Sequence, residues 1–137
     1  MLKIRIILII FIFGLVSTLS GVASGQSEKD LKKAFQKIDE AMEKKEYEKV
    51  EAMLKPLSDE GIPEATNGLG VMYSQGLGVE KNNKKAIQLF QLTLKQFPES
   101  KIIPEGEKEE IKKFILGEIA KLEKAENAKK MSENLDK

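Results

Sequence analysis

The stretch ATNGLGVMYSQGLGV, residues 65–79, decides the fold of this chain, because it holds four glycines within a short distance. Such glycines occur in phosphate-binding loops, in tight hairpins and between closely packed helices. A dinucleotide-binding loop would need a third glycine where this chain has Tyr73, and a Walker loop would need a lysine where Val79 follows Gly78. The sequence therefore excludes both phosphate-binding motifs.

A β-hairpin through residues 71–73 and a pair of helices remain as alternatives for this stretch. The flanking residues repeat with the helical period and no partner strand is evident, which favours the helices. In a helix interior Gly68 and Gly70 each cost roughly 1 kcal/mol relative to alanine. We therefore expect both to let a neighbouring backbone approach where two antiparallel helices cross. Gly76 is expected to end the first helix of this pair, and the loop that follows is expected to fold Val79 back onto the core.

Helix-capping residues and apolar periodicity predict four helices before residue 98. The first two precede Gly61, which is suited to a left-handed helix end. The third begins at Pro63, because proline favours the first helical position. The fourth begins at Asn82, whose side chain is suited to capping, and ends before Pro98.

Comparison of the chain with itself shows that these helices form two similar pairs, residues 27–61 and 62–97. The second pair has five extra residues within 77–81, where the glycine-rich loop lies. Residues 105–135 form a final helix, either continuous or broken near Asn127. Helix pairs of this kind bury their apolar faces by stacking. The sequence thus predicts an all-α fold, a short α-solenoid of two antiparallel helix pairs with a C-terminal capping helix.

The glycine-rich stretch and the helix after it resemble a known family, the Sel-one-like repeat, a longer-looped relative of the tetratricopeptide repeat. The resemblance covers residues 64–94, and residues 45–65 are similar to the half-repeat that often introduces such arrays. It implies an adaptor that holds proteins together. Some exported bacterial relatives are rich in cysteine and bind or hydrolyse penicillin-type compounds, whereas this chain has no cysteine. The resemblance is carried by Ala65, Leu69, Gly70, Met72, Tyr73, Gly76, Gly78, Val79, Asn82, Ala86, Ile87 and Phe90.

Residues 1–25 have the layout of a signal peptide, with Lys3 and Arg5 before an apolar run at 6–16 and small residues after it. Removal of the leader would leave residues 26–137 as one helical domain that is periplasmic or secreted. If the leader is retained, the chain would instead be a membrane-tethered accessory protein. Plausible cleavage points follow Ala23, Ser24 or Gly25.

After residue 25 the chain has no histidine, cysteine, tryptophan or arginine. The side chain best suited to proton transfer near neutral pH and the best thiol nucleophile are therefore missing. Metal sites built on histidine or cysteine are excluded, and we expect no metal and no cofactor. The formal net charge of +1 does not indicate a nucleic acid partner. Carboxylates are dense only at Asp59 and Glu60 and at the start of the last helix, so we expect no catalysis.

The sequence therefore predicts a non-catalytic exported module that binds another protein or peptide. In stacked helix pairs the first helix of each pair lines the inner surface, which we expect to be the binding surface. Each polar residue of this inner surface can equally be a solvated residue with no role in binding. Tyr47, Tyr73, Phe90 and Phe114 are assigned to the core, because each falls on an apolar stripe. The candidate partner-binding residues are Gln36, Glu40, Asn67, Val71 and Ser74.

Overall fold

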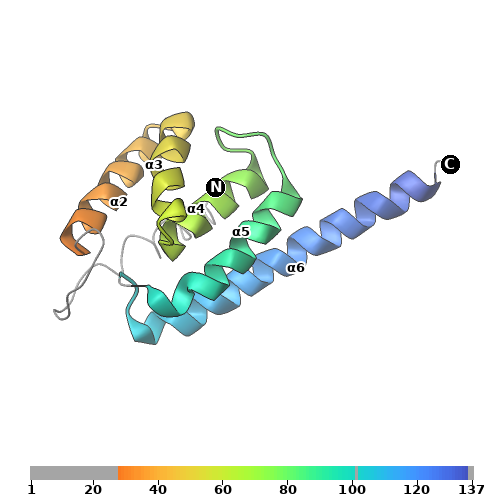
Figure 1. Ribbon diagram of the computed structural model, residues 1–137. Helices are drawn as coiled ribbons and strands as arrows, with labels where there is room; N and C mark the ends of the chain where they lie inside the picture. Colours follow the sequence, from red (N-terminus) through yellow and green to blue (C-terminus); the bar gives the residue numbers. More distant parts are fainter. Residues whose placement is uncertain (1–27, 101, 136–137) are drawn as a thin grey trace.

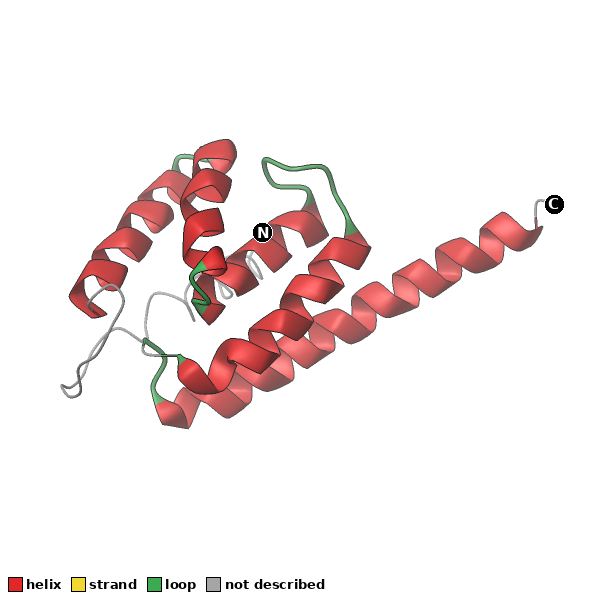
Figure 2. Ribbon diagram, in the orientation of Figure 1, coloured by secondary structure: helices red, strands yellow, loops and turns green. Residues whose placement is uncertain are grey.

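The computed structural model describes residues 28–100 and 102–135, and these residues form helices with no strand (Figures 1 and 2). The predicted all-α fold is therefore confirmed, and the predicted leader with its cleavage points lies outside the described residues. The elements in chain order are α2 (Glu28–Glu43), α3 (Tyr47–Asp59), α4 (Pro63–Gln75), α5 (Asn83–Gln96), the short 3-10 helix η1 (Phe97–Glu99) and α6 (Glu105–Leu135).

The helix ends lie where the capping residues predict them. Gly61 follows the end of α3 and Gly76 follows the end of α4. Both have a positive φ, of 84° and 72° respectively. The Gly76 amide donates to the carbonyl of Met72 at 2.8 Å and closes the last turn. Pro63 opens α4, and the Asn82 side chain accepts a hydrogen bond of 2.9 Å from the Lys85 amide at the start of α5. These local predictions are confirmed.

Helix α4 is the central element of the bundle. On one side, buried residues of α2 and α3, including Leu31 and Leu54, pack against Leu69 and Met72 of α4. On the other side, Val71 of α4 belongs to a second cluster with residues of α5 and α6. Because α4 is covered on both sides, it is buried around most of its circumference and has no single apolar stripe.

The two glycines inside α4 make room for side chains, which corrects the prediction that a backbone approaches them. A Cβ on Gly70 would lie 2.8 Å from the Phe90 ring of α5, and one on Gly68 would lie 3.0 Å from Leu54 of α3. The reason is that each neighbouring helix inserts a bulky side chain into the groove that a glycine leaves.

A backbone approaches closely at a third glycine, in the loop between α4 and α5. Gly78 has a φ of 66°, and a Cβ there would lie 2.7 Å from the Tyr47 carbonyl carbon and 2.9 Å from the Glu48 nitrogen. The loop therefore rests on the N-terminus of α3. Val79 packs against the core cluster of α2, α3 and α4, as the sequence predicts.

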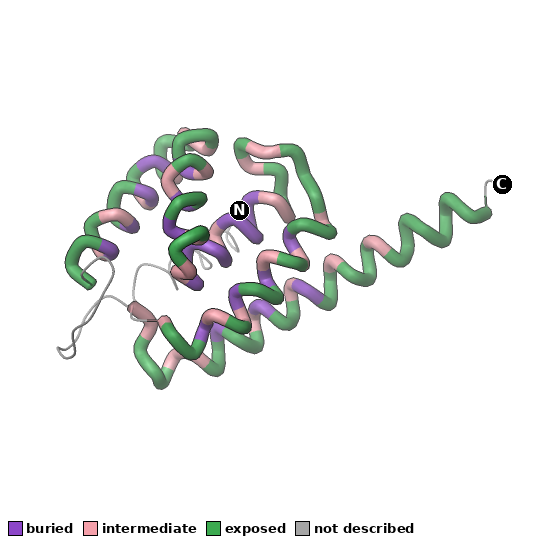
Figure 3. Tube along the Cα trace, viewed as in Figure 1, coloured by how far each residue is buried: buried purple, intermediate pink, exposed green. Residues whose placement is uncertain are grey.

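Helix α6 is continuous and extends well past the rest of the bundle (Figures 1 and 3). It has 31 residues, whereas α5, on which it packs, has 14. Its buried residues, Ile111, Ile115 and Ile119, all lie in its first half, and nearly every residue after Leu122 is exposed. None of the helices in the described ranges has the length and apolar character needed to cross a membrane.

Candidate functional site

The five residues that the sequence offers for partner binding do not meet on one exposed surface. Gln36 and Glu40 are exposed on α2. Ser74 is half-buried near the end of α4, where its hydroxyl donates a hydrogen bond of 2.8 Å to the Val71 carbonyl. Partner binding by these three residues stays a prediction.

The other two candidates are buried within the chain itself. Asn67 is 4% exposed and Val71 is 9% exposed. Val71 packs in the cluster that contains Phe90 and Ile115, because α5 and α6 cover this face of α4. In this conformation neither side chain is open to a partner, which corrects the expectation that the first helix of the second pair lines an accessible surface.

The aromatic residues assigned to the core are all packed against one of the two core clusters. Phe90 is 1% exposed, and the partly buried Tyr47, Tyr73 and Phe114 lie at the edges of the clusters. Tyr73 also joins the two ends of the glycine-rich loop. Its hydroxyl accepts a hydrogen bond of 2.8 Å from the Lys85 ammonium, which lies 4.1 Å from the ring centroid.

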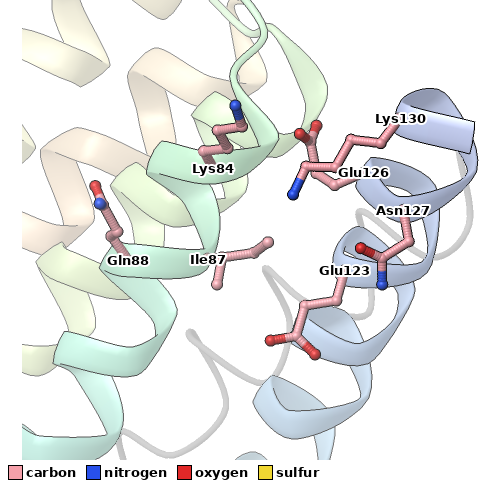
Figure 4. A pocket seen from close by; sticks show the side chains of 7 residues that line it. All are labelled: Lys84, Ile87, Gln88, Glu123, Glu126, Asn127 and Lys130. Atoms are coloured by element: carbon pink, nitrogen blue, oxygen red, sulfur yellow. The ribbon is translucent and has the colours of Figure 1, made fainter. Parts of the chain in front are cut away.

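A groove that the sequence reasoning did not find lies between the first turns of α5 and the second half of α6 (Figure 4). We call it the α5–α6 groove. Its volume is about 490 Å³. In Figure 4 Ile87 points from α5 toward α6, while Glu123 and Lys130 reach back from α6. The groove is lined by Lys84, Ile87, Gln88, Glu123, Glu126, Asn127 and Lys130.

The groove combines one apolar side chain with charges of both signs. Lys84 and Lys130 are exposed, as is Glu123, whereas Glu126 is half-buried. None of these four takes part in an ion pair within residues 28–100 and 102–135. Unpaired charges around a small apolar floor suit a polar, extended peptide segment better than an apolar ligand.

Two local features of the sequence build this groove. The Asn82 cap fixes where α5 begins, so that Lys84, Ile87 and Gln88 fall in its first turns. On α6, residues 123, 126, 127 and 130 recur at three- and four-residue steps and so share a face. That spacing on α6 is the signal in the sequence that could have indicated the groove. It identifies a site only once α6 is known to run antiparallel to α5.

The dense carboxylates do not form a group of metal ligands within the described residues. Asp59 and Glu60 are exposed, and no group of three potential metal ligands exists in the described part of the chain. A different carboxylate is perturbed. Burial, followed by the negative charge of Glu43, raises the pKa of Asp39 to about 6. Asp39 lies on α2, far along the chain from the α5–α6 groove.

Comparison with known families gives a match to the central helix pair. The family model described as Sel1 repeat matches residues 63–96, which are α4, the glycine-rich loop and α5. The central helix pair of the chain is a Sel1 repeat. Comparisons with curated proteins and with solved structures gave no match. Sel1 repeats generally mediate binding between proteins. The α5–α6 groove is thus formed in part by the second helix of the Sel1 repeat.

Proposed function

We propose that this Sel1-repeat protein is exported and binds another protein in the cell envelope or outside the cell, without catalysing a reaction. The observation that carries the proposal is the α5–α6 groove, which lies beside the second helix of the repeat and is lined by charges with no partner among the described residues. Export is supported by the layout of residues 1–25. The partner would be a protein with a polar, extended segment of mixed charge.

Site-specific photo-crosslinking tests where the partner binds. Gln88 lines the groove, whereas Gln91 is an exposed residue of the same helix outside it. We would place a photo-reactive amino acid at either position in the full chain and irradiate intact cells. A partner that binds in the groove should crosslink from position 88 and much less from position 91.

Charge reversal gives an independent test of the same surface. The double variant Lys84→Glu and Lys130→Glu should lower capture of the partner about ten-fold, because it removes both cations of the groove. The double variant Lys95→Glu and Lys113→Glu, on exposed positions of α5 and α6 outside the groove, is the matched control and should leave capture unchanged. Equal crosslinking from positions 88 and 91, or equal loss in both charge variants, would contradict the proposed site.

The export part of the proposal has its own measurement. The N-terminal sequence of the protein recovered from its host should begin at Ser24, Gly25 or Gln26. An intact leader in the membrane fraction would instead identify a membrane-tethered accessory protein. The crosslinking experiment remains valid in that case, because the groove lies far along the chain from the leader.

A further inference from the structure

A second site lies at the opposite end of the repeat, around a buried carboxylate at the start of α4. Glu64 is the second residue of α4 and is only 4% exposed. Its Oε1 accepts a hydrogen bond from the hydroxyl of Ser100, which in turn accepts one of 3.2 Å from the Ile103 amide. Its Oε2 is buried and has no hydrogen-bond partner in the described residues.

An unpartnered buried oxygen is costly for a carboxylate. Burial raises the pKa of Glu64, while the Ser100 hydrogen bond, a backbone hydrogen bond and the charge of Lys108 act in the opposite direction. The Lys108 ammonium is itself engaged, at 2.7 Å from the Glu105 carboxylate and 3.4 Å from the Pro98 carbonyl. Because removing a carboxylate from water without a full set of partners costs free energy, Glu64 is suited to receive one further donor.

Glu64 lines a pocket of about 250 Å³ between α2, the start of α4 and the segment after η1. Two exposed carboxylates, Glu60 and Glu99, share this pocket. Its other walls are mostly apolar. This volume is below the usual range for pockets that bind a small-molecule ligand, and it suits a single side chain. The remaining lining residues are Leu31, Gly61, Ile62, Pro63 and Ile102.

We propose that this pocket receives one lysine side chain of the partner protein, whose ammonium is held by the negative charge of Glu60, Glu64 and Glu99. The inference rests on the proposed function, because it specifies the chemistry of the protein partner. Lysine fits for two reasons. Its apolar stem matches the apolar walls while its charged end meets the carboxylates. Oε1 of Glu64 is bonded to Ser100 and Oε2 is buried, so this carboxylate attracts a point charge but cannot form the two parallel bonds that arginine prefers.

Short peptides test this inference without knowledge of the partner. The probe is an acetylated, amidated pentapeptide with lysine between alanines, and its control has norleucine in place of lysine. We would titrate each into the full chain and follow backbone amide signals by NMR. The lysine peptide should shift the amides of Gly61, Ile62 and Ile103 in a saturable manner. The norleucine peptide should bind at least about ten-fold more weakly, because it lacks the charged donor.

Matched variants locate the effect. Glu64→Gln keeps the size of the side chain and an oxygen for Ser100, and it should weaken binding of the lysine peptide about ten-fold or more. Glu110→Gln removes the same charge from an exposed position of α6 outside the pocket, and it should leave binding unchanged. A folded Glu64→Gln variant that binds the peptide as well as the wild type does would overturn the inference.

Two further outcomes are decisive. If the natural partner is captured equally by wild type and by Glu64→Gln, the proposed function stands and the lysine pocket does not. Binding of the lysine peptide with no partner captured at all would support the pocket while contradicting the proposed function.

Discussion

Substitution of Gly70 by alanine is the sharpest test of how α4 and α5 pack. The added Cβ would lie 2.8 Å from both Cδ1 and Cε1 of Phe90, whereas carbon atoms pack best at about 3.5–4.0 Å. The ring cannot easily withdraw, because Phe90 is 1% exposed and enclosed by Val71, Ala86 and Ile115. The clash therefore falls on a part of the core that is already filled.

The magnitude follows from two opposing effects. Alanine in place of glycine stabilises a helix interior by up to about 1 kcal/mol. Overpacking of a filled core costs about 1–3 kcal/mol, and contact with two ring atoms places Gly70→Ala in the upper part of that range. We therefore expect a net loss of about 1–2 kcal/mol in the free energy of unfolding. Urea denaturation followed by circular dichroism measures it.

Gly117→Ala is the matched control for this substitution. Gly117 lies in α6 between the buried Ile115 and Ile119, and a Cβ there would meet nothing within 4 Å. This variant should gain about 0.5–1 kcal/mol, because only the helix propensity changes. The double variant Gly70→Ala and Phe90→Leu should lose about 1 kcal/mol less stability than the sum of the losses in the two single variants. A Gly70→Ala variant as stable as the wild type would refute the packing argument.

Substitutions at Gly78, Asn82 and Asp39 test other parts of the fold by the same urea denaturation. Gly78→Ala should cost about 2 kcal/mol or more, since it combines a left-handed φ with a clash against the α3 backbone, and Gly61→Ala, whose nearest atom is 3.9 Å away, should cost less. Asn82→Ala should cost about 1 kcal/mol through loss of the α5 cap, while Asn82→Ser should retain most of the stability. Asp39 should make the chain less stable as pH rises from about 4 to about 6, because its pKa is raised from 3.8 to about 6 and the folded state holds the proton more tightly. Asp39→Asn should reduce that decline and stabilise the chain at neutral pH by about 1 kcal/mol, after allowance for solvent screening, while the raised pKa of Glu64 sustains the remainder. An unchanged decline would exclude a contribution from Asp39.

The features that the sequence predicts correctly are those that depend on a few neighbouring residues. Pro63, Gly76 and Asn82 each fix a helix end by their own backbone or side-chain chemistry, and the structure places a helix end at each. The extra length of the second pair likewise becomes the loop that returns Val79 to the core. Such features need no knowledge of which helices touch.

The features that the sequence reasoning misplaces depend on contacts between distant residues. Asn67 and Val71 are expected on the open inner surface of stacked helix pairs, whereas both are buried. Val71 is buried because residues of α5 and α6 complete its cluster. The α5–α6 groove was missed for the same reason. Its two halves, near residues 84–88 and 123–130, are more than thirty residues apart, and nothing local indicates that they meet.

The burial of α4 also explains why one Sel1 repeat is accompanied by helices on both sides. Leu54 of α3 fills the space above Gly68, and Phe90 of α5 fills the space above Gly70. Met72 completes the core with α2 and α3, while the opposite cluster is closed by Ile111 and Ile115 of α6. Residues 63–96 alone would leave apolar residues of both clusters exposed to water. The cost in free energy of folding grows with the apolar area exposed. The flanking helices therefore serve as caps of a minimal array, and α6 beyond its buried first half forms one wall of the α5–α6 groove.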